Sequence, residues 1–169
     1  LAELRLVAGK DTHVLFHPDL TFSQNARLRR SPKPPFRLAF FGRIQTYKGL
    51  PLFVEAIEIL RARGISVEPG IFGEGNIEPL RGRLEALGAE IVNRWIPSDE
   101  IATLLTRYDA VVASHIEASQ SGVVAAAHGL GLPVIATPVG GLREQVIDLE
   151  NGTMAATATA EGIAHAAMR

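Results

Sequence analysis

The sequence lacks cysteine, and it has few aromatic residues and no long apolar run. Without cysteine it cannot form disulfide bonds or thiolate metal sites, which fits a reducing compartment. No run approaches the roughly 18 apolar residues of a membrane span, and the first residues lack the pattern of a signal peptide. We therefore expect a cytoplasmic protein without a membrane-spanning helix.

An excess of either charge is also missing, because the formal net charge is −1. A nucleic-acid-binding domain has a basic footprint, so we expect no nucleic-acid partner. Aromatic residues make up 6% of the chain and hydrophobic residues 47%, so the core must be mainly aliphatic. The 169 residues suffice for one domain with a sizeable core, and this composition is typical of helices packed on a parallel sheet.

Residues 1–35 show no regular pattern and are predicted to be an N-terminal segment and linker. Within them, residues 25–35 (NARLRRSPKPP) combine four basic residues with three prolines, which disfavour a helix. A solvated linker is the favoured interpretation. The alternative is contact with an anionic lipid surface, which would make the protein peripheral at the inner face of a membrane.

From Phe36 to the C-terminus, predicted strands alternate with predicted helices. This alternation is typical of βαβ units, and right-handed crossovers then produce a doubly wound, Rossmann-like parallel sheet. We therefore predict one α/β domain over residues 36–169. The predicted strands are 37–42, 67–72, 90–93, 109–113 and 133–137; the predicted helices are 50–63, 77–87, 99–108, 142–148, one from 160 and an alanine-rich one that begins near 121.

Four local features refine this pattern. Pro69 lies inside a predicted strand and lacks the ladder N–H, so we expect an edge, a bulge or a late start there. Asn76 and Ser98 are predicted to cap the helices that follow them. Asn151-Gly152 is predicted to be a turn.

Residues 114–141 carry the most chemical information. A loop with the acid Glu117 follows a short apolar strand, and Gln120-Ser121-Gly122 then begins the alanine-rich helix. Ser121 or Gln120 can cap that helix and leave free N–H groups for a phosphate. An acid beside an anion site makes sense if it faces sugar hydroxyls or a developing positive charge. An exposed loop acid beside an ordinary cap is an equally good interpretation.

The loop from Gly42 to Gly49 follows the first predicted strand. It holds Arg43, with its planar fork of donors, and Lys48, a mobile point charge. Both could bind one diphosphate, although the spacing alone favours two solvated surface cations. The loop matches neither the P-loop nor the GxGxxG fingerprint.

The third strand end carries Arg94-Trp95-Ile96, where the indole could meet a nucleobase, but packing of Trp95 is favoured. Gly73-Glu74-Gly75 is predicted to be a structural turn. The histidines show no metal-ligand spacing, and His115 is interpreted as an incidental loop residue. We expect no metal.

Taken in order, these segments resemble the group 1 glycosyltransferases, from Phe36 to the C-terminus. The matching motifs are FFGRIQTYKG, IFGEGN, IPSDEIATLLTRYDAVVAS, SHIEASQSG and GLPVIATPVGGLREQV. The resemblance implies the C-terminal, donor-binding half of a retaining, family 4-type enzyme of the GT-B fold, which uses a nucleotide-diphosphate sugar and no cofactor. A role in polysaccharide or glycolipid biosynthesis is implied as well.

The resemblance also implies roles for individual residues. Arg43 and Lys48, in the loop that begins at Gly42, match the basic pair that holds the diphosphate and stabilises the leaving group. Glu117 matches the acid that contacts the donor sugar. The remaining implied donor-binding residues lie near the phosphates (Gln120, Ser121, Gly122) and near the base (Arg94, Trp95, Ile96).

One departure concerns a second glutamate, which in the family binds the nucleotide ribose. Its position is occupied by Ala125, or by Ala126 when the alignment runs back from Gly131, and QSG replaces the more usual GFG. We therefore expect the ribose contact to be absent or supplied by another group.

A second departure is size, because the family has two domains and an acceptor bound mostly by the first. We expect this chain to be a fragment that binds donor weakly and turns over little or nothing alone. Two alternatives remain open: a GT-B sugar-nucleotide epimerase, which would need further acids and histidines, and a non-catalytic nucleotide-sugar-binding module.

Overall fold

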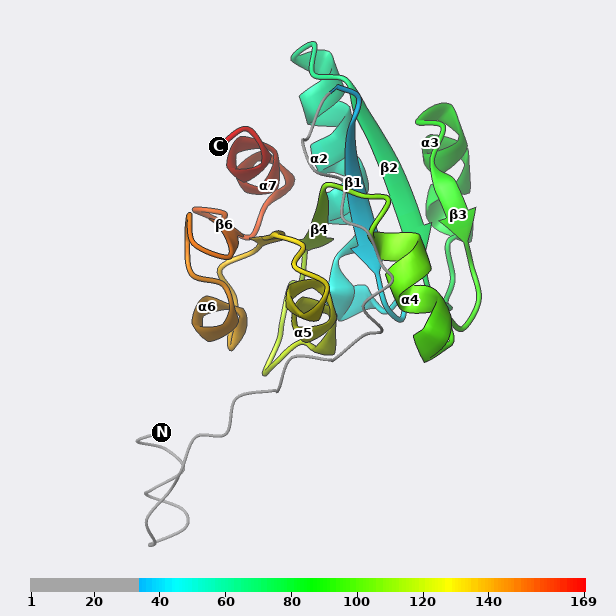
Figure 1. Cartoon of the computed structure of the whole chain (residues 1–169). Helices are drawn as coiled ribbons and strands as arrows, with labels where there is room; N and C mark the ends of the chain where they lie inside the picture. The colour runs from blue at the N-terminus through cyan, green and yellow to red at the C-terminus, as the bar shows by residue number, and fades with distance from the viewer. Residues whose placement is uncertain (1–33) are drawn as a thin grey trace, which may run out of the picture.

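A computed structural model describes residues 34–169, in which six parallel strands form one sheet (Figure 1). The strand order is β3-β2-β1-β4-β5-β6, the order of the doubly wound Rossmann sheet. The predicted single α/β domain is confirmed. The strands are β1 (Phe36–Phe41), β2 (Val67–Phe72), β3 (Glu90–Val92), β4 (Ala110–Ala113), β5 (Val134–Ala136) and β6 (Gly152–Met154).

Helices cover both faces of this sheet. One face packs against α2, α3 and α7, and the other against α4, α5 and α6 (Figure 1). Two 3-10 turns precede helices α2 and α3. The bounds are η1 (Thr46–Lys48), α2 (Leu50–Ala62), η2 (Glu78–Leu80), α3 (Arg81–Ala86), α4 (Ser98–Leu105), α5 (Gly122–Gly129), α6 (Leu142–Gln145) and α7 (Ala160–Ala167).

The central strands are mostly apolar because both of their faces are buried. In β1, Leu38 and Phe40 join the core under α2 and α7, whereas Ala39 joins the core under α4 and α5. Alternate residues of a strand point to opposite faces, so a strand between two helical layers needs apolar residues at every position. This explains the continuous apolar run that predicts β1.

Of three expectations about local structure, the one for Ser98 is wrong, and those for Pro69 and Asn151-Gly152 are confirmed in part. β2 is a continuous central strand, in which Pro69 pairs with Leu38. The proline is tolerated because β3 joins β2 only from Gly70 onward, so at Pro69 the strand has a neighbour on one side. Ser98 is the first residue of α4 and does not cap it. The predicted turn is present and ends at Asn151, but Gly152 already begins an edge strand, β6, which pairs with β5.

The expectation for the helix after Asn76 is confirmed only in part. Asn76 accepts a hydrogen bond through Oδ1 from the backbone N–H of Glu78 (3.0 Å), but the N-cap residue is Ile77 and the predicted helix is split between η2 and α3. The predicted linker at 25–35 lies almost wholly outside the described residues. No helix within residues 34–169 is long and apolar enough to cross a membrane.

The topology selects one place on the sheet. The strand order reverses between β1 and β4, which are neighbours although two strands separate them in sequence. In open α/β sheets, ligands bind at the carboxyl ends of the strands on either side of such a reversal. The loop with Arg43 and Lys48 follows β1, and the loop with Glu117 follows β4.

Candidate functional site

The loops that follow β1 and β4 are tied together. The backbone N–H of Ile116 donates to the carbonyl of Tyr47 (2.7 Å), and Ser114 Oγ donates to the carbonyl of Lys48 (3.1 Å). Gly49 has a φ of 68°, and a Cβ there would lie 1.9 Å from the backbone carbonyl oxygen of Ser114. Glycine therefore permits the close approach that brings Lys48 onto the end of β4.

Lys48 is a buried cation, with 9% of its surface exposed. Its Nζ lies 2.7 Å from His115 Nε2 and 5.4 Å from the centre of the Tyr47 ring. Burial, together with the nearby positive charge of Arg43, lowers the pKa of Lys48 from its ordinary value. The side chain is therefore held in one place, unlike the solvated cation that the spacing alone favours.

Arg43 is exposed, and its positive charge lies close enough to Lys48 to lower the pKa of the lysine. No carboxylate within residues 34–169 forms a salt bridge with either cation, although most other arginines of this region do form one. Two neighbouring positive charges that lack a salt-bridge partner in this part of the chain favour the binding of an anion.

His115 is the residue that sequence reasoning missed. It is 3% exposed, and its Nε2 contacts both Lys48 Nζ and, at 3.3 Å, Ser121 Oγ. Burial, followed by the charge of Lys48, lowers the pKa of His115 to about 4. A single histidine in a loop gives no sequence pattern. The only signal was its position directly after a buried strand.

The N-terminus of α5 differs from the prediction. Ser121 is the N-cap residue, but its side chain makes no capping hydrogen bond and its hydroxyl faces His115. Gln145 of α6 holds the Ser121 backbone instead, accepting from its N–H (2.8 Å) and donating to its carbonyl (3.1 Å). Gly122 is exposed at the start of the helix, so no side chain covers the positive end of its dipole as a cap.

Glu117 lies exposed between His115 and α5. The loop that carries it is supported by the loop after β5: Gly141 N–H donates to the carbonyl of Ala118 (3.3 Å). Gly140 has a φ of 45°, and a Cβ there would lie 1.6 Å from the same oxygen. The double glycine therefore provides the close contact that supports the acidic loop. Gln120 is exposed in this loop as well.

Gly42 packs directly against α5, because a Cβ there would lie 2.9 Å from Val123 of that helix. The loop after β1 is thus in contact with the start of α5.

The loops after β1, β2 and β3 are joined by hydrogen bonds between neighbouring loops. Ile44 N–H donates to the carbonyl of Glu74 (2.7 Å), and Gly75 N–H donates to Asn93 Oδ1 (3.2 Å). This confirms the structural turn predicted around Glu74.

The end of β3 presents an aromatic ring to solvent. Trp95 is 66% exposed, so the favoured packing interpretation is wrong within this domain. Arg94 forms an ion pair with Glu100 (2.6 Å) and Ile96 is buried. The exposed indole thus lies on the same sheet edge as Lys48, with β2 between their strands.

The position of the second family glutamate is buried. Ala125 and Ala126 are each 1% exposed. Neither side chain can reach a ligand, and the packed helix leaves no room for a carboxylate at either position.

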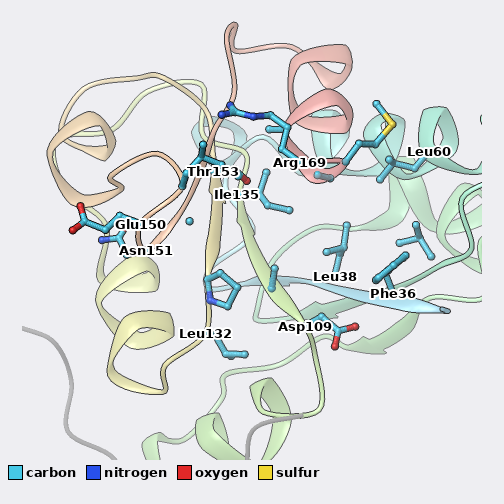
Figure 2. A pocket seen from close by; sticks show the side chains of 18 of the residues that line it. Phe36, Leu38, Leu60, Asp109, Leu132, Ile135, Glu150, Asn151, Thr153 and Arg169 are labelled. Atoms are coloured by element: carbon cyan, nitrogen blue, oxygen red, sulfur yellow. The ribbon is translucent and has the colours of Figure 1, made fainter. Parts of the chain in front are cut away.

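Two other features lie apart from these residues. No group of three metal-ligating side chains occurs in the part of the chain that the structure describes. A cavity of about 890 Å³ lies at the opposite edge of the sheet, where the strands begin (Figure 2). Its lining includes Phe36, Leu38, Ile135 and Arg169 and is mainly apolar, and it contains none of the predicted site residues.

Comparison of the sequence with known proteins identifies a family and several relatives. Residues 35–169 match the family model described as Glycosyl transferases group 1. A D-inositol 3-phosphate glycosyltransferase of Paenarthrobacter aurescens is 34% identical over 143 residues, which cover 79% of this chain and 35% of that protein. The chain thus spans about a third of the length of such curated relatives.

Solved structures share the fold. The C-terminal domain of a group 1 glycosyltransferase, LpcC of Francisella tularensis, has a TM-score of 0.63 at 24% identity, covering 77% of this chain and 72% of that one. Anabaena Alr3699/HepE, solved in complex with UDP-glucose, has a TM-score of 0.66 at 20% identity, covering 77% and 37%. With the motifs, the topology and the family match in agreement, the chain belongs to the group 1 glycosyltransferases.

Proposed function

We propose that this chain forms the nucleotide-sugar-binding domain of a retaining glycosyltransferase, with the donor at the carboxyl ends of β1 and β4. The observation that carries the proposal is the pair Lys48 and Arg43, two neighbouring cations without a carboxylate partner in residues 34–169. A diphosphate supplies the missing negative charge. Each charge-assisted hydrogen bond contributes about 1.5–3 kcal/mol.

The N-terminus of α5 would support the same group. Its first-turn N–H groups lack a side-chain cap, and its dipole favours negative charge. Gly122 is exposed and has no side chain, so a phosphate can approach the start of α5 closely. As the sugar–phosphate bond breaks, negative charge grows on the leaving diphosphate, so fixed cations stabilise the transition state more than the ground state.

Glu117 would face the donor sugar. Its exposed carboxylate can accept hydrogen bonds from sugar hydroxyls and stabilise positive charge that develops on the ring. No protein nucleophile is assigned. The acceptor would contact a further domain, as the longer length of the relatives allows.

The nucleoside would extend from the diphosphate toward the end of β3. There the exposed indole of Trp95 offers a stacking surface, and the backbone near Ile96 offers polar groups for the base edge. The ribose cannot be bound by the second family acid, because Ala125 and Ala126 are buried alanines.

That missing acid favours one alternative, a non-catalytic module that binds nucleotide sugars without transferring them. Supplying an N-terminal domain and assaying sugar transfer separates the two functions. For an enzyme, Glu117→Gln should lower kcat by on the order of a hundredfold while donor affinity changes little. If transfer is equally fast with Glu117→Gln, the role of Glu117 is wrong; if no transfer occurs with any donor, the module is the better description.

Donor binding itself can be tested on the chain alone. A panel of nucleoside diphosphates and nucleotide sugars should raise its melting temperature, and the largest shift identifies the base and sugar. Absence of any shift at millimolar concentration would reject the proposed donor site.

A further inference from the structure

His115 has no role in the family resemblance or in the function proposed so far, yet it lies at the centre of the site. Its backbone is fixed, because its carbonyl accepts a hydrogen bond from Thr137 Oγ1 (2.6 Å). Its ring lies between Lys48 and Ser121 and makes an edge contact with the Tyr47 ring, 6.4 Å between centroids. A buried imidazole is thus held between both halves of the site.

The chemistry of the contact fixes its direction. An ammonium group donates hydrogen bonds and accepts none, so Lys48 Nζ is the donor and His115 Nε2 the acceptor. The contact thus requires a neutral ring with its proton on Nδ1, a buried atom that has no hydrogen-bond partner within residues 34–169. Burial and the charge of Lys48 lower the pKa of His115, which keeps the ring neutral beside two cations.

We propose that His115 is a positioning residue that holds the Lys48 ammonium in place for the diphosphate of the donor. The inference rests on the proposed donor site. An ammonium has three N–H donors. One of them bonds to His115 Nε2, and the other two remain for phosphate oxygens.

The physical benefit is preorganisation. A lysine side chain normally loses much conformational freedom when it binds a ligand. Here Lys48 is already buried, and its position is set by His115 Nε2, by the Tyr47 ring and by the Ser114 hydroxyl on its carbonyl. The ordering cost is met during folding, so less of the binding energy is lost when the ligand arrives.

The side chains that face this imidazole come from two segments. Lys48 and Tyr47 approach from η1, with the Arg43 charge beyond Lys48. Ser121 approaches from the start of α5. No carboxylate of the described residues forms an ion pair with His115. A protonated His115 would repel Lys48, so the positioning role requires the neutral ring.

A double-mutant cycle in UDP or GDP binding, measured by calorimetry, tests the proposal. His115→Phe retains a ring but removes the acceptor, and it should weaken binding about tenfold, the effect of one lost hydrogen bond to a charged group. In a Lys48→Met background the same change should cost less than roughly twofold, because the two residues act as one unit. His115→Gln, whose amide oxygen can replace Nε2, should restore most of the affinity.

Three results would overturn the proposal: no loss with His115→Phe, an equal loss in both backgrounds, or no recovery with Gln. The first, combined with a large loss for Lys48→Met, would leave the donor site itself intact. If the wild-type chain binds neither nucleotide, the proposed donor site is refuted. NMR of the ring nitrogens then decides separately whether His115 accepts a hydrogen bond from Lys48. The Nδ1–H tautomer, with a pKa that rises in Lys48→Met, upholds that contact; a proton on Nε2 refutes it.

Discussion

At the scale of single residues, burial separates the charged groups of the site into two kinds. Lys48 and His115 are buried in contact with each other, whereas Arg43 and Glu117 are exposed. Buried groups are fixed in place and have altered pKa values, while exposed ones can move to meet a ligand. The site therefore combines a rigid cation with adaptable partners.

The buried histidine predicts a specific acid sensitivity. The pKa of His115 is about 4 in the folded chain and 6.5 in its unperturbed form, so the unfolded chain binds the proton first as pH falls. Its contribution to stability is present above pH 6.5 and is lost toward pH 4. Between about pH 7.5 and pH 5, the free energy of unfolding measured in urea should fall by on the order of 2 kcal/mol more for the wild type than for His115→Gln. Parallel pH profiles would show that the ring titrates normally.

The exposed tryptophan predicts a selective effect on the nucleoside. Trp95→Ala removes the stacking surface and should weaken UDP or GDP binding by about 1–3 kcal/mol. Binding of inorganic pyrophosphate serves as the control and should be unchanged, because Arg43 and Lys48 remain. Unchanged nucleotide affinity in calorimetry would place the base elsewhere.

Sequence reasoning singled out the charged residues of the candidate site but not the contacts among them. Arg43, Lys48 and Glu117 stand out because charges at the ends of apolar strands are conspicuous. His115 was missed because its burial depends on the close approach allowed by Gly49, 66 residues earlier than it. Local sequence carries no signal for such a tertiary contact.

At the scale of secondary-structure elements, a clamp between two helices positions the start of α5. Gln145 of α6 bonds to both the N–H and the carbonyl of Ser121. This clamp replaces the side-chain cap that the sequence predicts. Caps were mispredicted here and at Ser98 because several polar residues near a helix start satisfy the same preference, and tertiary partners decide among them.

Breaking this clamp should loosen the site without touching a ligand. Gln145→Ala leaves the partly buried N–H of Ser121 without its partner and removes one of two hydrogen bonds to the Ser121 carbonyl, which still accepts from Ala125 N–H. It should lower the free energy of unfolding by about 1–3 kcal/mol. Gln145→Glu retains the acceptor and loses the donor, so it should cost less. Chemical denaturation of the three proteins measures the difference, and an unchanged Gln145→Ala midpoint would contradict the clamp.

The strands show where local patterns suffice. Short apolar runs predict β1 and β4 well, since strands buried on both faces need mostly apolar residues. β6 was missed because a three-residue edge strand with glycine has no such pattern. Its pairing with β5 comes from the tertiary fold.

At the scale of the whole molecule, topology turns two separate loops into one site. The order β3-β2-β1-β4-β5-β6 makes β1 and β4 neighbours, so residues near 45 and near 118 meet at one sheet edge. The alternation of strands and helices predicts this architecture from sequence. It does not predict that the cavity in Figure 2 lies at the other edge, because cavities depend on side-chain packing.

The most direct measurement is calorimetric titration of UDP and GDP into the wild-type chain and into the Arg43→Ala, Lys48→Ala double variant. Loss of two charge-assisted contacts should weaken binding by at least about 3 kcal/mol, more than a hundredfold. Arg81→Ala with Arg83→Ala removes the same charge from exposed positions in α3 and serves as the control. We predict loss of binding in the first variant only. Equal affinity in all three proteins would contradict a donor diphosphate held by Arg43 and Lys48.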